Sequence, residues 1–391
     1  MLRAARRAEE IEYAIRDVTL SARELEKKGI EVLKLNIGDP VAYDFDTPKH
    51  LKEALYDATL EGLNGYTESE GLLELRVAIA ERERKKNKIS LSSQDIVVTT
   101  GVTEAIHMLF GALLEPGDEV LVPGPSYPPY ISLAKFFEAT PLEYRTIEEE
   151  GWIPDLDDLR KKISPRCKAV VVINPNNPTG ALYPKKILKE ICGLAGEYNL
   201  PLISDEIYDE IVFKEKHTSP SFSDIPMIIF NGISKVFMAP GWRIGWTIFY
   251  NFEDFDSIKQ AYLKEARVRL SANSVCQKAS VAALEGSRNH IEDMVKKLKK
   301  RRDFSHKRLN EISGISCTLP KGAFYIFPKI SWEDKKFALD LLLKEHVLFV
   351  HGSGFSKRYG RNHLRAVFLP PLELLEEAFY RLERFVGGLR R

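Results

Sequence analysis

The sequence has little of several features that would point to particular classes of protein. Only four cysteines occur among 391 residues, and they form neither a CxxC pair nor a spacing typical of a metal site. Buried free thiols in a reducing compartment are therefore favoured over a disulfide framework.

The net charge is only +1, from 57 basic and 56 acidic residues. A balance this even provides no field that would attract nucleic acid or an anionic membrane.

Long apolar runs are missing as well. No apolar stretch approaches the length needed to span a bilayer, and the first residues, "MLRAARRAEEIEYAIRDV", lack the apolar segment of a secretory signal. We find no internal repeat, low-complexity tract or Gly/Ser linker. The sequence therefore predicts a soluble cytoplasmic protein whose partners are small molecules, with no nucleic acid and no membrane among them.

What the sequence does contain is enough apolar residues, 44%, for a large core, and its length favours two domains. From about residue 94, short β-branched runs alternate with helical periodicity, which indicates an α/β fold with a mainly parallel sheet. Ligands of such sheets collect at the carboxyl ends of the strands. We expect five strand ends to line one cleft. The five runs are "DIVVTT", "EVLVPG", "KAVVVIN", "LPLIS" and "MIIFNG".

The first two strand ends offer an anion site and an aromatic ring. Gly101 permits a tight turn into a helix, whose free N–H groups at Val102 and Thr103 would suit a phosphate. A plain turn is the alternative. In "PGPSYPPY", Tyr127 follows the second strand and could cover a flat ligand, with core packing as the alternative.

The next two strand ends offer polar groups. "NPNNPTG" is mostly explained by turn chemistry, which leaves one asparagine as a ligand candidate. Asp205 closes the strand "LPLIS", and Tyr208 follows three residues later. An aspartate here either caps a helix or, in a dry cleft, needs a cationic partner to stay charged. A protonated ring nitrogen of a ligand would be such a partner.

The fifth strand end brings a lysine among apolar and small residues, in "NGISKVFMAPGWRIG". Desolvation and the nearby Arg243 would both lower the pKa of Lys235, which frees its amine to form an imine with an aldehyde. Pyridoxal phosphate combines an aldehyde, a pyridine nitrogen, a phenolate oxygen and a phosphate. The five strand ends together supply a partner for each of these groups.

The same stretches, in order, resemble a known family. They are "LNIGDP", "YTESEGLLELR", "VTTGVTEAI", "PGPSYPPY", "NPNNPTG", "SDEIYDE", "SKVFMAPGWRIG", "KGAFYIFP" and "HGSGFS…HLRAVF". The chain resembles the class I aminotransferases of the fold-type I pyridoxal phosphate enzymes, closest to the alanine aminotransferase branch. The resemblance implies a large domain over residues 48–280, with a mostly parallel seven-stranded sheet flanked by helices. It further implies a smaller α/β C-terminal domain over 281–391, joined by an N-terminal arm over 1–47.

The resemblance also implies a role for each matching residue. Lys235 would be the Schiff-base lysine, Asp205 would pair with the pyridine nitrogen, and Tyr208 would meet the phenolate oxygen. The other residues expected at the cofactor are Val102, Thr103, Tyr127, Asn177, Ser234 and Arg243. Those expected at the substrate carboxylate are Gly38, Asn177 and Arg365. A turn glycine and a surface arginine are the alternative interpretations of Gly38 and Arg365.

A homodimer with shared active sites is implied too, with Tyr66 reaching the phosphate of the neighbouring subunit's site.

Two departures from the family pattern stand out. Some aminotransferases carry a phosphate-binding serine three residues before the lysine, where this chain has Gly232, so that its hydroxyl lies at Ser234. The arginine for a distal substrate carboxylate has no counterpart either, because Arg267 and Arg269 lack a matching motif.

The function implied is transfer of the amino group of an L-amino acid, with alanine as the expected donor, to 2-oxoglutarate by a ping-pong mechanism. An aspartate or aromatic donor, or a pyridoxal phosphate-dependent lyase reaction on the same fold, remains an alternative. A non-catalytic regulator is disfavoured, because the family's regulators carry an added DNA-binding domain for which this sequence leaves no room.

Overall fold

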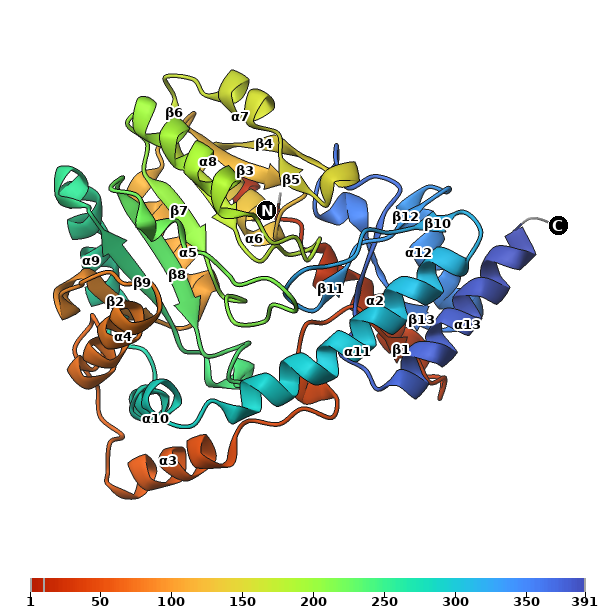
Figure 1. Ribbon diagram of the computed structural model, residues 1–391, viewed down its shortest axis with the longest axis horizontal. Helices are drawn as coiled ribbons and strands as arrows, with labels where there is room; N and C mark the ends of the chain where they lie inside the picture. The colour runs from red at the N-terminus through yellow and green to blue at the C-terminus, as the bar shows by residue number, and fades with distance from the viewer. Residues whose placement is uncertain (1, 10, 390–391) are drawn as a thin grey trace.

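The structure is a computed structural model that describes residues 2–9 and 11–389. At its centre lies an eight-stranded sheet (Figure 1). In order across the sheet, its strands are β2 (Ile96–Thr99), β9 (Gly245–Tyr250), β8 (Met227–Gly232), β7 (Leu202–Asp205), β6 (Cys167–Ile173), β3 (Glu119–Gly124), β4 (Thr140–Ile147) and β5 (Ile153–Pro154). The strands from β8 to β4 run parallel, whereas β9 is antiparallel to both of its neighbours. The predicted mostly parallel sheet is confirmed.

The number of strands differs by one from the seven predicted. The additional strand, β5, has two residues and pairs antiparallel with the end of β4. A strand this short carries no hydrophobic run of its own, so no pattern in the sequence marks it. The five strands predicted from β-branched runs are all present, as β2, β3, β6, β7 and β8.

Alternate residues of the central strands face two separate hydrophobic layers. In β6, Val170 and Val172 pack in one layer with α8 (Lys185–Glu197), whereas Val171 packs in the other with α5 (Val102–Leu113). Helices cover both faces of the sheet (Figure 1). Since side chains alternate across a strand, a strand covered on both faces has to be apolar throughout. These strands therefore appear in the sequence as continuous apolar runs.

The register of the sheet brings the carboxyl ends of the predicted strands to one edge. Thr99 at the end of β2 and Gly232 at the end of β8 both pair with Gly245, the first residue of β9. Ile173 at the end of β6 pairs with Asp205 at the end of β7. Segments far apart in the sequence therefore leave the sheet side by side.

The C-terminal part of the chain forms smaller sheets (Figure 1). A three-stranded antiparallel arrangement has the order β11 (Tyr325–Ile326), β15 (Leu364–Val367) and β14 (Val350–His351). Next to it, β1 (Leu33–Lys34) pairs in parallel with β13 (Val347–Leu348), and β10 (Ile315–Ser316) pairs with β12 (Lys329–Ile330). The β1–β13 pairing joins the N-terminal segment to the C-terminal part. The domain boundaries at residues 47 and 280 remain predictions.

The remaining helices surround these sheets. They are α1 (Arg6–Glu9), α2 (Ala14–Glu26), α3 (Lys49–Leu60), α4 (Leu73–Lys86), α6 (Pro128–Phe136), α7 (Leu156–Lys162), α9 (Asp256–Arg269), α10 (Ser274–Glu285), α11 (Asn289–Glu311), α12 (Asp334–Glu345) and α13 (Leu372–Leu389). Within residues 2–9 and 11–389, none of the helices combines the length and the apolarity needed to cross a membrane.

The four cysteines are free thiols, as predicted. Cys167 and Cys192 are buried, but Cys276 and Cys317 are only partly buried. The expectation of burial is therefore wrong for the last two. Both lie at an end of a secondary-structure element, where the packing is less complete than in the centre of the sheet.

Candidate active site

A cavity of about 700 Å³ opens at the edge of the sheet where the five predicted strands end. Each of the five strand ends contributes to its lining, as the sequence predicts. The residues concerned are Val102 and Thr103 after β2, Tyr127 after β3, Asn177 after β6, Asp205 and Tyr208 at β7, and Ser234 and Lys235 after β8. Gly38, Arg243 and Arg365 line the same cavity. Tyr66 is the one predicted site residue that lies outside it, with 84% of its surface exposed.

Lys235 reaches into the cavity from the segment that follows β8. Its Nζ donates a hydrogen bond of 2.7 Å to the backbone oxygen of Gly38 and lies 5.8 Å from the centre of the Phe324 ring. Gly38 has no room for a side chain, because a Cβ there would overlap the hydroxyl of Tyr325. Close packing against the site, and not only a turn, therefore requires glycine at this position.

The amine of Lys235 is easier to deprotonate than an ordinary lysine. Burial is the main cause, and it lowers the pKa of Lys235 to about 8. The positive charges of Arg243, Arg365 and Arg16 act in the same direction, and the negative charge of Asp39 opposes them. About a tenth of the amine is therefore neutral at pH 7, far more than for an ordinary lysine, and the neutral form is the one that acts as a nucleophile or a base.

Asp205 is a buried carboxylate without a cationic partner. Its Oδ2 accepts a 2.9 Å hydrogen bond from the hydroxyl of Tyr130, and its Oδ1 accepts one of 3.3 Å from the N–H of Ile207. Among the described residues, no Lys or Arg forms an ion pair with it. Burial raises the pKa of Asp205 to about 6, against the opposing effect of these two hydrogen bonds. A cationic ring nitrogen placed beside Asp205 would supply the missing charge.

Tyr130 was not predicted as a site residue. It lies in α6, one helical turn after Tyr127, and is fully buried. The spacing of the two tyrosines in "SYPPY" was the available signal, because residues three apart share one face of a helix.

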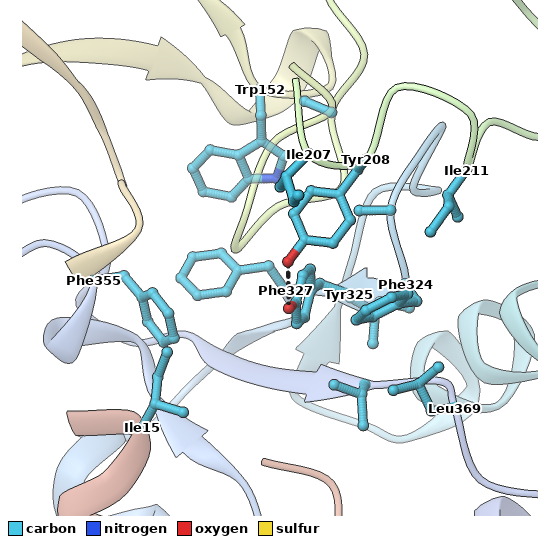
Figure 2. Packing of buried hydrophobic residues seen from close by; sticks show 14 of the residues in the cluster. Ile15, Trp152, Ile207, Tyr208, Ile211, Phe324, Tyr325, Phe327, Phe355 and Leu369 are labelled. Atoms are coloured by element: carbon cyan, nitrogen blue, oxygen red, sulfur yellow. Dashed lines mark hydrogen bonds between the residues drawn. The ribbon is translucent and has the colours of Figure 1, made fainter. Parts of the chain in front are cut away.

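Tyr208, a predicted site residue, lies against Tyr325, which was not predicted as a site residue. Their hydroxyl oxygens lie 2.7 Å apart, and both rings are buried. Figure 2 shows the two hydroxyls pointing toward each other, with Phe324 and Phe327 packed around them. Tyr325 lies in β11, far from Tyr208 in the sequence, so only the stretch "KGAFYIFP" hinted at its role. The pair presents phenolic groups on one side of the cavity.

Arg365 is buried, with 1% of its surface exposed, which excludes the surface interpretation. One Nη donates to the Asn177 side-chain oxygen at 3.1 Å, and the other donates to the backbone oxygen of Asn36. The guanidinium also lies 4.7 Å from the ring centre of Tyr325 and 4.8 Å from that of Phe355. No carboxylate pairs with it in the described part of the chain. A buried guanidinium without an anion is suited to bind a carboxylate.

The part of the cavity at the start of α5 has the features of a phosphate site. Gly101 has φ +86° and precedes α5, and a Cβ at this glycine would lie 2.6 Å from an Nη of Arg243. Arg243 itself donates to the backbone oxygen of Thr100 at 3.2 Å. Its guanidinium is thereby held at the start of α5, where the N–H groups of Val102 and Thr103 have no helical partners.

Two further predicted residues complete the lining. Ser234 is buried beside Lys235 and is among the residues that line the cavity. Tyr127 is half-buried, and its hydroxyl lies 3.3 Å from that of Tyr13, which the sequence analysis did not single out. The N-terminal segment therefore contributes to the wall of the site.

Comparisons with known proteins agree with this arrangement. The family model described as "Aminotransferase class I and II" matches residues 30–382. The glutamate-pyruvate aminotransferase AlaA of Escherichia coli is 37% identical over 97% of this chain and 96% of its own. The alanine aminotransferase of Mycobacterium tuberculosis is 38% identical over 98% and 92%. A solved structure of an alanine aminotransferase from Pyrococcus furiosus is 57% identical, with a TM-score of 0.97 over 99% of this chain and 100% of that one. Similarity of this extent shows that the chain belongs to the class I and II aminotransferases.

Proposed function

We propose that the protein is a pyridoxal phosphate-dependent alanine aminotransferase. It would convert alanine and 2-oxoglutarate into pyruvate and glutamate by a ping-pong mechanism. The observation that carries the proposal is a buried carboxylate without a cation, Asp205, and a buried guanidinium without an anion, Arg365, in one cavity with Lys235. The two unpaired charges match the pyridine nitrogen of the cofactor and the α-carboxylate of the substrate.

Pyridoxal phosphate is the cofactor of this family, and the residues of the cavity fit it. Asp205 would hold the pyridine nitrogen, Lys235 would bind the aldehyde carbon, and Tyr208 would meet the phenolate oxygen. When bound, the cofactor supplies a ring that accepts the electron pair left at the substrate's Cα. The remaining residues that would hold it are Asn177 at the phenolate oxygen, Tyr127 over the ring, and Val102, Thr103, Ser234 and Arg243 at the phosphate.

The side chains of the cavity would then divide the work of the reaction. Arg365 binds the α-carboxylate and fixes the orientation of the substrate, which places the Cα hydrogen within reach of Lys235. Lys235, whose pKa is about 8, accepts this proton as the neutral amine and releases it again. Asp205 would hold the pyridine nitrogen and would stay ionised there, because a buried carboxylate and a positive ring nitrogen stabilise each other.

Alanine as the preferred donor is supported by the names of the relatives and by the lining of the cavity. Neither Arg267 nor Arg269, the two arginines considered from the sequence, belongs to that lining. Arg269 donates to Glu104 at 2.8 Å, and Arg267 lies 3.9 Å from Glu70. Both are engaged elsewhere, so neither provides a binding site for an aspartate donor.

The test is an amino-donor screen of the purified holoenzyme. We expect alanine with 2-oxoglutarate to yield pyruvate and glutamate in equal amounts, with kcat/KM for alanine about tenfold or more above that for aspartate. Lys235→Ala should abolish the reaction. Borohydride reduction followed by peptide mapping should place the cofactor on Lys235 in the wild type. Release of ammonia in place of glutamate would indicate a lyase, and attachment to another lysine would contradict the assignment.

We also propose a homodimer with shared sites, a cytoplasmic location and the domain division 1–47, 48–280 and 281–391. The exposure of Tyr66 outside the cavity of its own chain supports the shared site. The pairing of β1 with β13 supports an N-terminal arm that belongs with the C-terminal domain. The amino acid and 2-oxo acid substrates are the expected small-molecule partners.

A further inference from the structure

The hydroxyls of Tyr208 and Tyr325 face each other (Figure 2), and both residues line the cavity. Their oxygens lie 2.7 Å apart, and either oxygen could be the donor. A distance this short places one hydroxyl proton between the two oxygens. Each phenol carries a single proton, so the hydroxyl that accepts this bond keeps its own proton for another acceptor. The direction of the bond therefore decides which tyrosine can donate into the cavity.

Backbone hydrogen bonds hold the two tyrosines next to each other. Two residues before Tyr325, the N–H of Ala323 donates to the backbone oxygen of Ile211 at 2.8 Å. The N–H of Ile211 in turn donates to the backbone oxygen of Tyr208 at 2.8 Å. The Tyr208 ring packs edge-on against the rings of Phe324 and Tyr325, with ring centres 5.4 and 5.6 Å away. The contact between the hydroxyls therefore belongs to the packed structure of the site.

Arg365 favours Tyr325 as the donor. Its guanidinium lies 4.7 Å from the ring centre of Tyr325, and the two residues belong to the paired strands β15 and β11. Burial raises the pKa of both hydroxyls, but the positive charge of Arg365 opposes this rise at Tyr325. A nearby positive charge makes a phenol more acidic, and the more acidic phenol of a pair is the better donor.

The surroundings of the two hydroxyls agree with this direction. A Cβ at Gly38 would overlap the Tyr325 hydroxyl, so the backbone of Gly38 closes one side of it. Within the described part of the chain, Tyr325 is the only hydrogen-bond partner of the Tyr208 hydroxyl. When Tyr325 donates, the proton of Tyr208 has no acceptor in the protein. The phenolate oxygen of the cofactor would be that acceptor.

We infer that Tyr325 is a positioning residue, whose hydroxyl donates to Tyr208 and thereby turns the Tyr208 proton toward the phenolate oxygen of pyridoxal phosphate. The inference rests on the proposed function, in which Tyr208 meets that oxygen. Hydrogen bonds in a chain polarise one another, so donation from Tyr325 strengthens the bond that Tyr208 makes. Tyr325 acts through Tyr208 and forms no bond to the phenolate oxygen itself.

The experiment compares Tyr325→Phe with the wild type, using two forms of the cofactor. Pyridoxal phosphate carries the phenolate oxygen, whereas 3-deoxypyridoxal phosphate lacks it and keeps the aldehyde, the ring nitrogen and the phosphate. Each compound is titrated into the apoenzyme, and its dissociation constant is measured. The ring of the variant retains the packing of Tyr325 against Phe324 and Arg365.

We expect Tyr325→Phe to weaken binding of pyridoxal phosphate about three- to tenfold, as for loss of one hydrogen bond between neutral groups. Binding of 3-deoxypyridoxal phosphate should not change, because it offers Tyr208 no phenolate oxygen.

The second readout is the absorbance of the bound cofactor as a function of pH. A donor to the phenolate oxygen stabilises its negative charge and lowers the proton affinity of the imine nitrogen formed with Lys235. In the Tyr325→Phe holoenzyme, the pKa of the chromophore should therefore rise by about half a pH unit.

Tyr262→Phe is the matched control. Tyr262 is fully buried, its hydroxyl lies 2.6 Å from that of Thr247, and it does not line the cavity. The variant also breaks a buried pair of hydroxyls, and it should leave both dissociation constants and the absorbance titration as in the wild type.

Tyr208→Phe and the double variant Tyr208→Phe/Tyr325→Phe complete a double-mutant cycle. Since Tyr325 acts through Tyr208, the second replacement should add nothing to the loss of affinity caused by the first.

An equal loss of affinity for the two cofactor forms would show that Tyr325 only supports the structure. A further loss in the double variant would show that Tyr325 acts without Tyr208. Either result would overturn the inference and leave the aminotransferase proposal standing. A wild type that binds pyridoxal phosphate but does not react with alanine would contradict the proposed function instead. The two titrations would still report on Tyr325 in that case, because they require no turnover.

Discussion

At the scale of single residues, aromatic side chains stabilise the two unpaired charges of the cavity. The hydroxyl of Tyr130 donates to Asp205, and the rings of Tyr325 and Phe355 lie against the guanidinium of Arg365. A hydroxyl or a ring face compensates a buried charge less well than a full counter-ion does. The site is therefore electrostatically incomplete until a cation reaches Asp205 and an anion reaches Arg365.

Tyr130→Phe tests the hydrogen bond to Asp205. Loss of this donor should raise the pKa of Asp205 further above about 6, because the hydroxyl stabilises the ionised form. In the cofactor-free protein at pH 7, less of the carboxylate would be ionised to receive the pyridine nitrogen, and the affinity for pyridoxal phosphate should fall about tenfold. The loss should shrink as the pH rises toward 8, where Asp205 ionises in the variant as well. The measurement is a pH profile of the dissociation constant of pyridoxal phosphate, obtained by titrating the apoenzyme between pH 6 and 8.

Tyr144→Phe is the matched control for this prediction. Tyr144 is also fully buried, and its hydroxyl donates to the backbone oxygen of Val171 at 2.8 Å, away from the cavity. Its replacement should lower stability and leave the pH profile unchanged. Identical profiles for the two variants would show that Tyr130 acts on stability alone.

Glu206, next to Asp205, is a buried acid that the proposed mechanism does not use. Its Oε1 accepts hydrogen bonds from Ser204 at 3.0 Å and from Ser219 at 2.6 Å. Burial raises its pKa from 4.5 to about 8. Between these pH values the folded protein binds more protons than the unfolded chain, so the free energy of unfolding falls as the pH rises.

Glu206→Gln should remove this pH dependence, because an amide oxygen can accept the same two hydrogen bonds and does not titrate. Relative to the wild type, the variant should gain stability from pH 5 to pH 8, at most about 1.4 kcal/mol per pH unit. Glu206→Ala leaves two buried hydroxyls without an acceptor and should cost about 2–4 kcal/mol. Thermal unfolding at several pH values measures both effects. A constant difference between wild type and Glu206→Gln would mean that Glu206 is ionised in the folded state.

At the scale of secondary-structure elements, the site is built where the backbone leaves the sheet. The strands are buried throughout and hold their ends in fixed positions, while their last residues and the segments after them carry the polar groups. The start of α5 is the clearest case. Gly101 combines a left-handed conformation with close contact to Arg243, so that the helix N-terminus and the guanidinium face the same space.

Gly101→Ala should therefore weaken binding of the cofactor. A Cβ at this position is strained at φ +86° and would displace the Arg243 guanidinium. We expect the dissociation constant of pyridoxal phosphate to rise about tenfold or more, equivalent to at least about 1.4 kcal/mol. Titration of the apoenzyme with the cofactor measures it.

Gly117→Ala provides the control. Gly117 has φ +89°, and no atom lies within 4 Å of the position of its Cβ. The Gly117→Ala variant should lose about 1 kcal/mol of stability through backbone strain, as the Gly101→Ala variant also should. Its affinity for the cofactor should not change. Equal affinities in the two variants would show that the Gly101–Arg243 contact does not shape the phosphate site.

At the scale of the whole molecule, the two ends of the chain close the cavity that the sheet opens. The N-terminal segment brings Gly38 to Lys235, and the C-terminal part brings Arg365 to Asn177. Tyr66 remains exposed and outside this assembly. This exposure is consistent with the proposed homodimer, in which Tyr66 would reach the phosphate of the partner's site across a two-fold axis.

Mixing of two inactive proteins tests the shared site. Lys235→Ala is unfolded and refolded together with an inactive Tyr66 variant in equal amounts. If Tyr66 acts in the partner's site, each mixed dimer has one site with both native residues. Random pairing should then restore roughly a quarter of the wild-type activity.

Lys235→Ala mixed with an inactive Arg365 variant is the control, because both residues line one cavity of the same chain. Every site in that mixture keeps one defect, and no activity should return. If the Tyr66 mixture also recovers no activity, Tyr66 acts in the site of its own chain and the shared site is wrong.

The sequence alone determined the elements of this protein and the residues that leave them. Apolar runs predict five strands, and the residues at their ends, among them Asp205 and Lys235, line one cavity as expected. These features are local, because strand burial and turn chemistry depend on neighbouring residues. The two-residue β5 escaped the prediction, since it has no local pattern.

The tertiary structure decided which distant side chains meet. The Tyr130–Asp205 and Tyr208–Tyr325 contacts join segments 75 and 117 residues apart, and the first turn of α2 carries Arg16 to the cavity. In the sequence, Tyr130 and Tyr325 have the pattern of core residues, and Arg16 has that of a charged helix face. Their positions follow from how α6, β11 and α2 dock on the sheet. Docking depends on the shapes of whole packed surfaces, and these form only when the chain has folded.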